Sequence, residues 1–148
     1  MAYEASVAVD FSCGREVVYR ALSYLGRYPE WNQGMIYISH TGPMFPGLKF
    51  ETRTRVLGQI NAAEVEVVNL IANTVIKLRS NTGLISYDAT YRLRDKDGGG
   101  SVVTCDLVFE FNNVVLDQAR GAIEDMARDR LERDLRKLAE ILCGQPSN

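Results

Sequence analysis

The stretch VVLDQARGAIEDMARDRLERDLRKLAEILC, residues 114–143, decides the fold. Its apolar residues recur every three or four positions and charged side chains fill most of the others, a pattern typical of an amphipathic α-helix. The apolar positions are Leu116, Ala119, Ile123, Met126, Ala127, Leu131, Leu135, Leu138 and Leu142. At ~1.5 Å per residue such a helix is roughly 45 Å long, which is longer than most helices in a small domain. We therefore expect it to lie across a curved sheet and close it.

The apolar stripe of this helix changes direction near its middle. At 100° per residue, residues 116–127 share one face, whereas Leu131 and the later leucines lie roughly a quarter turn away. Arg130 and Asp134 occupy the edge that the first half would keep apolar. Either the helix bends over a twisted sheet, with these two residues forming an edge salt bridge, or its halves differ in task. In the second case the first half faces an internal space and the second half seals the end of the barrel.

Length and charge indicate one globular domain without a nucleic-acid role. A chain of 148 residues can bury roughly 68% of its unfolded surface in a single core. We expect that domain to span residues 1–143, followed by a frayed tail over residues 144–148. The net charge is −2 and the basic residues are scattered among acidic ones. No basic face is available to neutralise phosphates, so nucleic acid is not an expected partner.

The cysteines and the N-terminus favour a cytoplasmic protein. Cys13, Cys105 and Cys143 are odd in number, far apart and without a CxxC motif, so we expect reduced, buried or incidental thiols. The start MAYE has an acid where a signal peptide needs positive charge. No segment reaches the 18 or so apolar residues of a membrane span, so stable membrane insertion is not expected.

The N-terminal stretch combines a strand with two short helices. Residues 3–11 alternate apolar and polar side chains, as a half-buried strand does. A short helix follows over residues 12–25, with Glu16 early, where the helix dipole favours an acid. Its apolar side would consist of Val17, Val18, Ala21, Leu22 and Leu25. The turn YPEW, residues 28–31, indicates a second short helix, because proline is tolerated near a helix start.

The middle of the chain is typical of a meander of antiparallel strands. Turns rich in Gly, Asn, Pro or Asp separate segments of alternating character. The predicted strands are residues 35–41, 48–57, 60–70, 74–80, 84–94 and 101–111. With residues 3–11 this makes about seven strands.

One face of this meander mixes apolar side chains with hydroxyls. The positions that alternation turns inward are Phe50, Thr52, Thr54, Leu78, Ser80, Tyr87, Tyr91 and Phe109. Apolar walls with a few polar groups are typical of a small-molecule pocket, whereas in a solid core each buried hydroxyl would need a partner. The alternative is that Tyr87 and Tyr91 fill space and bond to the backbone.

The order strand, two short helices, six strands and long C-terminal helix is that of the α+β helix-grip fold, a curved antiparallel sheet wrapped around the helix. Four segments also fit: VVYRAL at 17–22, RYPEW at 27–31, GLKF at 47–50 and the basic helix over 128–142. The chain therefore resembles the START-like (SRPBCC) superfamily, and within it the polyketide cyclase/dehydrase and lipid-transport group. The superfamily also contains birch-pollen-allergen proteins and coenzyme Q-binding proteins.

The resemblance implies a cavity between the sheet and the first half of the long helix. The residues that we expect to bind a ligand there are Phe50, Thr52, Leu78, Tyr87, Tyr91, Phe109, Ile123 and Met126. Met44 and Phe45, two large apolar residues at a loop tip, would then be either a lid over the cavity mouth or a contact covered by a partner subunit.

Residues in familiar catalytic patterns are scarce. His40 is the single histidine, next to a turn, and no cysteine pair accompanies it, so neither a metal site nor a cofactor is expected. The sequence contains no G-x-S-x-G, Walker or G-x-G-x-x-G motif. Trp31 is expected to anchor the second short helix against the sheet.

Three functions remain from the sequence. The first is binding of a small hydrophobic ligand, such as a lipid, quinone or polyketide-like molecule, with a homodimer as an option. The second, which the resemblance suggests, is a polyketide cyclase or dehydratase in which Tyr87 and Tyr91 supply proton-transfer groups. The third is a non-catalytic interaction domain that works through the Met44–Phe45 loop or the charged outer face of the sheet.

Overall fold

The computed structural model describes residues 2–112 and 120–145. The described elements are β1 (Tyr3–Phe11), α1 (Arg15–Leu22), the 3-10 helix η1 (Leu25–Arg27), α2 (Tyr28–Trp31), β2 (Met35–Ile38), β3 (Lys49–Val56), β4 (Gln59–Ile71), β5 (Val75–Ser80), β6 (Ile85–Asp95), β7 (Ser101–Phe111) and α3 (Arg120–Cys143).

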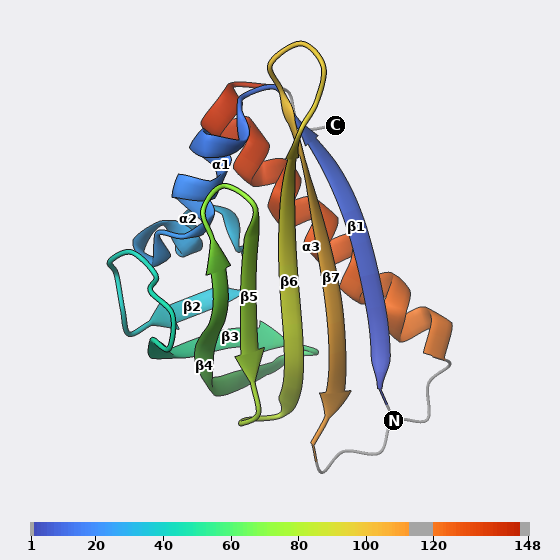
Figure 1. Ribbon diagram of the computed structural model, residues 1–148. Coiled ribbons are helices and arrows are strands. Elements are labelled where there is room, and N and C mark those ends of the chain that lie inside the picture. The colour runs from blue at the N-terminus through green and yellow to red at the C-terminus, as the bar shows by residue number, and fades with distance from the viewer. Residues whose placement is uncertain (1, 113–119, 146–148) are drawn as a thin grey trace.

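The strands form one antiparallel sheet in the order β1-β7-β6-β5-β4-β3-β2. Among the described strands, only the pairing of β1 with β7 joins strands that are distant in sequence. Figure 1 shows the sheet curving around α3, with α1 and α2 beside one end of that helix. The predicted α+β helix-grip fold is confirmed.

The alternation in the sequence sets the inward face of the sheet. In β1 every second side chain is buried, from Tyr3 to Phe11. The same alternation buries Ala63, Val65 and Val67 in β4. A single buried cluster then joins the sheet, α1, α2 and the second half of α3, where Leu138 is fully buried.

Several predicted boundaries were wrong by a few residues. The first short helix begins at Arg15, after an uncapped Gly14, and ends at Leu22, so Leu25 belongs to η1. Val17 is 42% exposed instead of buried, because an eight-residue helix covers the core with only one narrow face. The strand predicted over 35–41 ends at Ile38. The predicted start of the long helix, including Leu116 and Ala119, lies outside the described residues.

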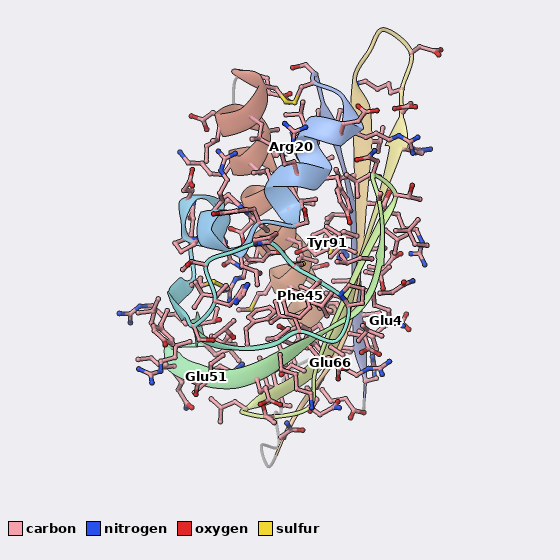
Figure 2. The ribbon with its side chains drawn as sticks, turned by 60° about the vertical axis from the view of Figure 1, so that its left-hand side comes forward. Glu4, Arg20, Phe45, Glu51, Glu66 and Tyr91 are labelled. Atoms are coloured by element: carbon pink, nitrogen blue, oxygen red, sulfur yellow. A yellow bond between two sulfur atoms is a disulfide. The ribbon has the colours of Figure 1, made fainter. Side chains whose placement is uncertain are left out.

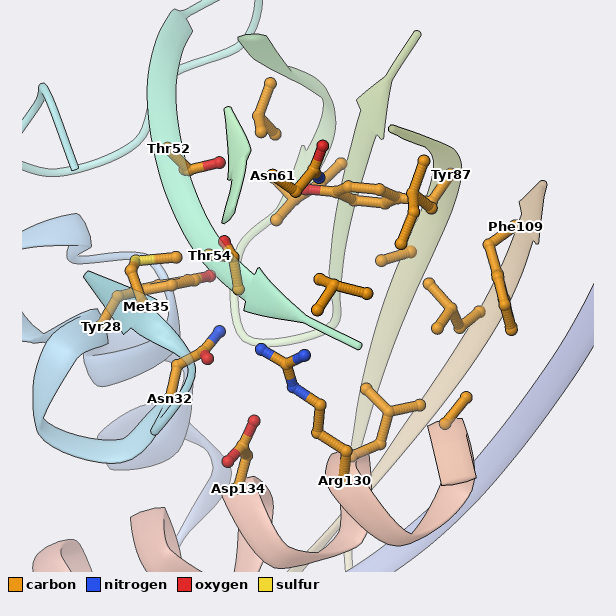
Figure 3. A pocket seen from close by; sticks show the side chains of 18 of the residues that line it. Tyr28, Asn32, Met35, Thr52, Thr54, Asn61, Tyr87, Phe109, Arg130 and Asp134 are labelled. Carbon is orange, nitrogen blue, oxygen red and sulfur yellow. The ribbon is translucent and has the colours of Figure 1, made fainter. Parts of the chain in front are cut away.

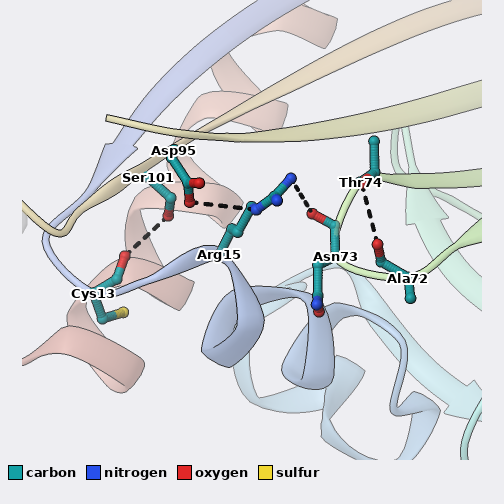
Figure 4. A network of polar contacts seen from close by, with 7 residues as sticks. All are labelled: Cys13, Arg15, Ala72, Asn73, Thr74, Asp95 and Ser101. Atoms are coloured by element: carbon teal, nitrogen blue, oxygen red, sulfur yellow. Dashed lines mark hydrogen bonds and ion pairs between the residues drawn. The ribbon is translucent and has the colours of Figure 1, made fainter. Parts of the chain in front are cut away.

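Polar contacts join the start of α1 to the ends of three strands (Figure 4). Ser101 Oγ donates to the Cys13 carbonyl at 3.0 Å. Arg15 lies 3.3 Å from a carboxylate oxygen of Asp95 and donates to the Asn73 carbonyl at 3.5 Å. These contacts position α1, and with it the following α2, over the end of the sheet.

The expectation of three reduced cysteines was wrong. Cys13, just after β1, forms a disulfide with Cys143, the last residue of α3, with their Cα atoms 5.4 Å apart. Figure 2 shows this bond as the yellow link at the end of α3. Cys105 is free and buried. The pairing brings together residues 130 positions apart in the chain, which no local spacing could indicate.

Gln145, the second residue after α3, is anchored as well. Gln145 accepts a hydrogen bond from the Ser12 amide at 2.8 Å and donates to the Asp10 carbonyl at 3.1 Å. Gln145 was expected in the frayed tail, but these bonds hold it to the end of β1. Residues 146–148 of that predicted tail lie outside the described part of the chain.

Candidate functional site

A cavity of about 270 Å³ lies between the inner face of the sheet and the first half of α3. Strands β3 to β7 supply one wall, α3 the opposite wall, and α2 with the start of β2 closes one side. Figure 3 shows these elements around the cavity. The volume is near the lower end of the ~300–1,000 Å³ range of ligand pockets.

All eight residues predicted to bind a ligand line this cavity. They are Phe50, Thr52, Leu78, Tyr87, Tyr91, Phe109, Ile123 and Met126. Alternation brought the six sheet residues to one face, and the 3.6-residue period of α3 turned the other two toward them. Their position is a finding, whereas their binding of a ligand stays a prediction.

Two other inward positions from the sequence have different places. Thr54 lines the cavity, and its side chain projects toward the centre in Figure 3. Ser80 is buried, and it donates to the Glu64 carbonyl at 2.8 Å away from the cavity lining. The hydroxyl of Ser80 therefore has the backbone partner that a buried polar group needs.

Most of the wall is apolar. Besides the predicted residues, Val65, Ala89, Leu107, Leu131 and Leu135 contribute side chains from both the sheet and α3. Such a surface favours an apolar ligand, because burial removes apolar area from water on both partners.

One side of the cavity has a different character, and we call it the polar end: Tyr28, Trp31, Asn32, Arg130 and Asp134. In Figure 3, Asn32, Arg130 and Asp134 project toward one another, and Tyr28 extends toward the same region. The first three residues come from the YPEW turn and its C-cap, and the other two come from α3. Sequence reasoning missed this cluster. The one signal was the pair of charges that interrupts the apolar stripe of the helix.

Arg130 and Asp134 were expected to form an edge salt bridge if the helix merely bent over the sheet, and that expectation was wrong. Arg130 Nη1 donates to the Arg55 carbonyl at 2.9 Å, while Asp134 accepts a long bond from the Gln33 amide at 3.4 Å. Asp134 is only 6% exposed. A Cβ at Gly34 would overlap the Arg130 guanidinium, so a glycine there makes room for this arginine. The alternative, a helix whose two halves differ in task, agrees with the structure.

Three groups at the polar end are buried without a hydrogen-bond partner. They are the Tyr28 hydroxyl, the Trp31 Nε1–H and the Asn32 Oδ1. Tyr28 is 4% exposed and Trp31 2%. Their rings pack together with centroids 4.7 Å apart. Trp31 also belongs to the buried cluster that contains sheet residues, as its predicted anchoring role requires, and it lines the cavity.

Burial keeps the tyrosines of the cavity neutral. It raises the pKa of Tyr87 to about 12, and it raises the pKa values of Tyr28 and Tyr91 above the ordinary value. Each hydroxyl is therefore a hydrogen-bond donor at neutral pH, since the charged form is disfavoured in the interior.

Burial also raises the pKa of the Asp134 carboxyl above its ordinary value. The hydrogen bond from the Gln33 amide and the positive charges of Arg130 and Arg133 oppose this shift without cancelling it. A buried carboxyl with a raised pKa beside neutral hydroxyls is able to exchange a proton with a bound molecule.

The cavity reaches solvent where Leu57 and Met126 contribute to its wall. Both residues line the cavity, and they are 51% and 52% exposed, respectively. Leu57 lies in the turn between β3 and β4, and Met126 lies on α3. We take these two residues as the mouth.

The Met44–Phe45 loop does not take part in the lining. Met44 is buried in the main core, whereas Phe45 is 53% exposed and contacts the ring of His40 edge to face. Figure 2 shows Phe45 on the loop that precedes β3. Of the two alternatives for this loop, the lid has no support, since neither residue lines the cavity; a contact covered by a partner subunit stays a prediction. His40 lies outside the lining too, with Nε2 3.3 Å from the Pro43 carbonyl.

The described part of the chain contains neither a metal-binding cluster nor a membrane-spanning helix. Among residues 2–112 and 120–145, no group of three or more His, Cys, Asp or Glu is placed to hold a metal ion. In the same part of the chain, no helix is long and apolar enough to cross a membrane.

Comparison with solved structures reveals the same fold in distant relatives. A START superfamily protein from Mycobacterium smegmatis is 16% identical, with a TM-score of 0.78 and coverage of 95% of this chain and 97% of the other. The Zhui aromatase/cyclase from Streptomyces sp. R1128 is 14% identical, with a TM-score of 0.73 and coverage of 97% and 93%. A major latex-like protein from Panax ginseng is 14% identical, with a TM-score of 0.70 and coverage of 95% and 97%.

Sequence comparison points to one family. Comparison with curated proteins gives no match. The family model described as polyketide cyclase/dehydrase and lipid transport matches residues 3–142. Because this match spans β1 to the last turn of α3, the chain belongs to the polyketide cyclase/dehydrase and lipid transport family.

Proposed function

We propose that this protein binds a small hydrophobic molecule, such as a lipid, quinone or polyketide-like compound, in the cavity between the sheet and α3. The observation that carries the proposal is a cavity of about 270 Å³ with apolar walls and a few polar groups at one side. The family and the fold support a scaffold for hydrophobic-ligand binding or polyketide-cyclase-like chemistry.

The energetics favour an apolar ligand. Burial contributes ~25 cal/mol for each Å² of apolar surface removed from water. The eight predicted residues contribute to both walls, six from the sheet and two from α3. The mouth at Leu57 and Met126 gives the ligand a route from solvent.

Native mass spectrometry of the freshly purified protein tests the proposal. We expect a mass above that of the chain, and denaturation should release an apolar compound that solvent extraction recovers. A protein that carries nothing, and whose melting temperature does not respond to a panel of apolar compounds, would contradict ligand binding.

A blocking variant locates the bound molecule. Ala127 lines the cavity from α3, so Ala127→Trp should fill the space and abolish ligand retention. Asp129→Trp places the same side chain on the exposed side of the same helix and should retain the ligand. Equal retention by the two variants would place the binding site elsewhere.

The second candidate is a cyclase or dehydratase on the same scaffold. The observation that favours it is the buried carboxyl of Asp134 beside neutral hydroxyl donors. Since burial raises the pKa of Tyr87 and Tyr91, these two residues would act as acids or donors, not as bases. Conversion of a polyketide-like substrate that disappears in Tyr87→Phe or Tyr91→Phe would establish this activity over simple binding.

The remaining expectations rest on the sequence alone. We do not propose the third function, a non-catalytic interaction domain with a filled core, because the structure has an internal cavity. The cytoplasmic location, the homodimer option and the exclusion of nucleic acid stay predictions.

A further inference from the structure

We infer that the ligand carries, at the end that enters the polar end of the cavity, an uncharged group that both accepts and donates hydrogen bonds. A hydroxyl next to a ketone has this chemistry. The inference rests on the proposed function and narrows its ligand class.

The first argument is that two buried donors and one acceptor lack partners. The Tyr28 hydroxyl and the Trp31 Nε1–H are donors, and Asn32 Oδ1 is an acceptor. Buried polar groups in folded proteins nearly always have a partner, so each exception needs an explanation. All three residues belong to one turn of chain and line the cavity. A ligand with an acceptor beside a donor would satisfy them together.

The second argument concerns charge. Arg130 and Asp134 place a positively charged guanidinium and an ionisable carboxyl at the polar end of the cavity. The guanidinium already donates to the Arg55 carbonyl. A ligand carboxylate would be attracted by Arg130 but would lie near the Asp134 carboxyl, and a ligand ammonium would be attracted by Asp134 but repelled by Arg130. Each charged head group therefore loses part of its attraction to the second side chain, whereas an uncharged head group that bonds to Tyr28, Trp31 and Asn32 needs neither charge.

The third argument concerns selection against plain hydrocarbons. An apolar molecule would fill the walls but would leave the groups of the YPEW turn unpaired. A site built to bond polar groups of its ligand discriminates strongly against analogues that lack them. The polar end therefore selects among molecules of equal apolar area.

Calorimetric titration with three matched compounds tests the inference: a naphthyl hydroxymethyl ketone, naphthoate and naphthalene. We expect the hydroxyketone to bind at least about tenfold more tightly than the other two, which corresponds to one or two net hydrogen bonds. Equal affinities for the three compounds would overturn the inference and leave the proposed function standing. Absence of binding by all three would overturn the inference, while the proposed function would still be decided by native mass spectrometry.

Variants assign the effect to the polar end. Tyr28→Phe and Asn32→Leu should each weaken hydroxyketone binding about tenfold, should change naphthalene binding far less, and should not lower the melting temperature of the free protein. Unchanged or increased stability is expected because each change removes an unpaired buried group.

Tyr24→Phe is the matched control, since Tyr24 is 43% exposed and outside the cavity lining. If Tyr28→Phe and Asn32→Leu weakened the binding of all three compounds equally and also lowered the melting temperature, these residues would have a structural role and the inference would be overturned.

Discussion

Asp134 shows what a single buried carboxyl does to the stability of this fold. Burial raises its pKa, and the Gln33 amide and Arg130 only partly oppose the shift. In the unfolded chain the carboxyl has its ordinary pKa, so between the two pKa values the folded state binds more protons than the unfolded state. The free energy of unfolding therefore falls as the pH rises through that window, and the loss is complete above the raised pKa.

Asp134→Asn should thus stabilise the protein more at neutral pH than in acid. The amide keeps an acceptor for the Gln33 amide but cannot ionise. Thermal unfolding followed by circular dichroism between about pH 3.5 and pH 7.5 would measure the difference in melting temperature across the carboxyl range. Asp129→Asn, an exposed carboxylate on the same helix, controls for the change in net charge. A difference that stays constant over this range would contradict the shifted pKa.

The same residue illustrates why half of the site escaped the sequence. The inward residues of the sheet could be predicted, because alternation alone puts Thr52 and Tyr87 on one face. The polar end could not, since it joins Tyr28 and Asn32 to side chains that lie about 100 positions later in the chain. Arg130 and Asp134 were recognised as a break in a stripe, but the direction in which they point depends on how α3 crosses the sheet.

The helix α3 divides its length between two tasks. Ile123, Met126 and Arg130 line the cavity, whereas Leu138 and Ala139 are buried in the main core. This agrees with the quarter-turn change of the apolar stripe. Because the sheet curves, one straight apolar face could not serve both regions, so the sequence shifts its stripe where the contact changes.

Leu138→Ala should lower the free energy of unfolding by about 2–5 kcal/mol, the usual cost of emptying a fully buried leucine site. The folded fraction should still bind an apolar ligand with nearly unchanged affinity, since Leu138 is outside the cavity lining. Chemical denaturation and ligand titration of the same preparation would give both numbers. A loss of affinity as large as the loss of stability would show that the two halves of α3 are not independent.

Met126→Ala tests the opposite half of the helix. Met126 is 52% exposed at the mouth, so its truncation should change the free energy of unfolding by no more than about 0.5 kcal/mol. Naphthalene binding should weaken several-fold, because an apolar contact is lost at the entrance. Wild-type affinity in this variant would exclude Met126 from the binding surface, whatever its effect on stability.

At the scale of the whole molecule, the C-terminal end of β1 and the end of α3 are held together. The Cys13–Cys143 disulfide joins the end of β1 to the end of α3, and Gln145 adds two hydrogen bonds to the same corner. β1 also pairs with β7, the last described strand of the chain. The disulfide therefore closes a loop that contains most of the chain, since its two cysteines are 130 positions apart. The sequence predicted a long helix lying across the sheet, but it did not predict that Cys13 and Cys143 would form a disulfide.

Reduction of this disulfide should lower the melting temperature measurably. Cross-linking residues 130 positions apart restricts the unfolded chain, with an effect of about 2–5 kcal/mol on the free energy of unfolding. Melting curves with and without reductant would measure it. Cys13→Ser should match the reduced protein and lose its response to reductant, whereas Cys105→Ala, which removes the buried free thiol, should keep that response.

Counting the free thiols of the denatured protein, without added reductant, tests whether the Cys13–Cys143 disulfide is formed in the cell. One reactive thiol, Cys105, is expected if the disulfide is formed, and three if it is not. The cytosol keeps most thiols reduced, so a single thiol in protein trapped with an alkylating reagent at lysis would contradict the predicted cytoplasmic location. Three thiols at lysis would instead place the bond under redox control. The reduced form would then have the lower melting temperature, with the end of α3 released from β1 while the cavity-lining half keeps its contacts.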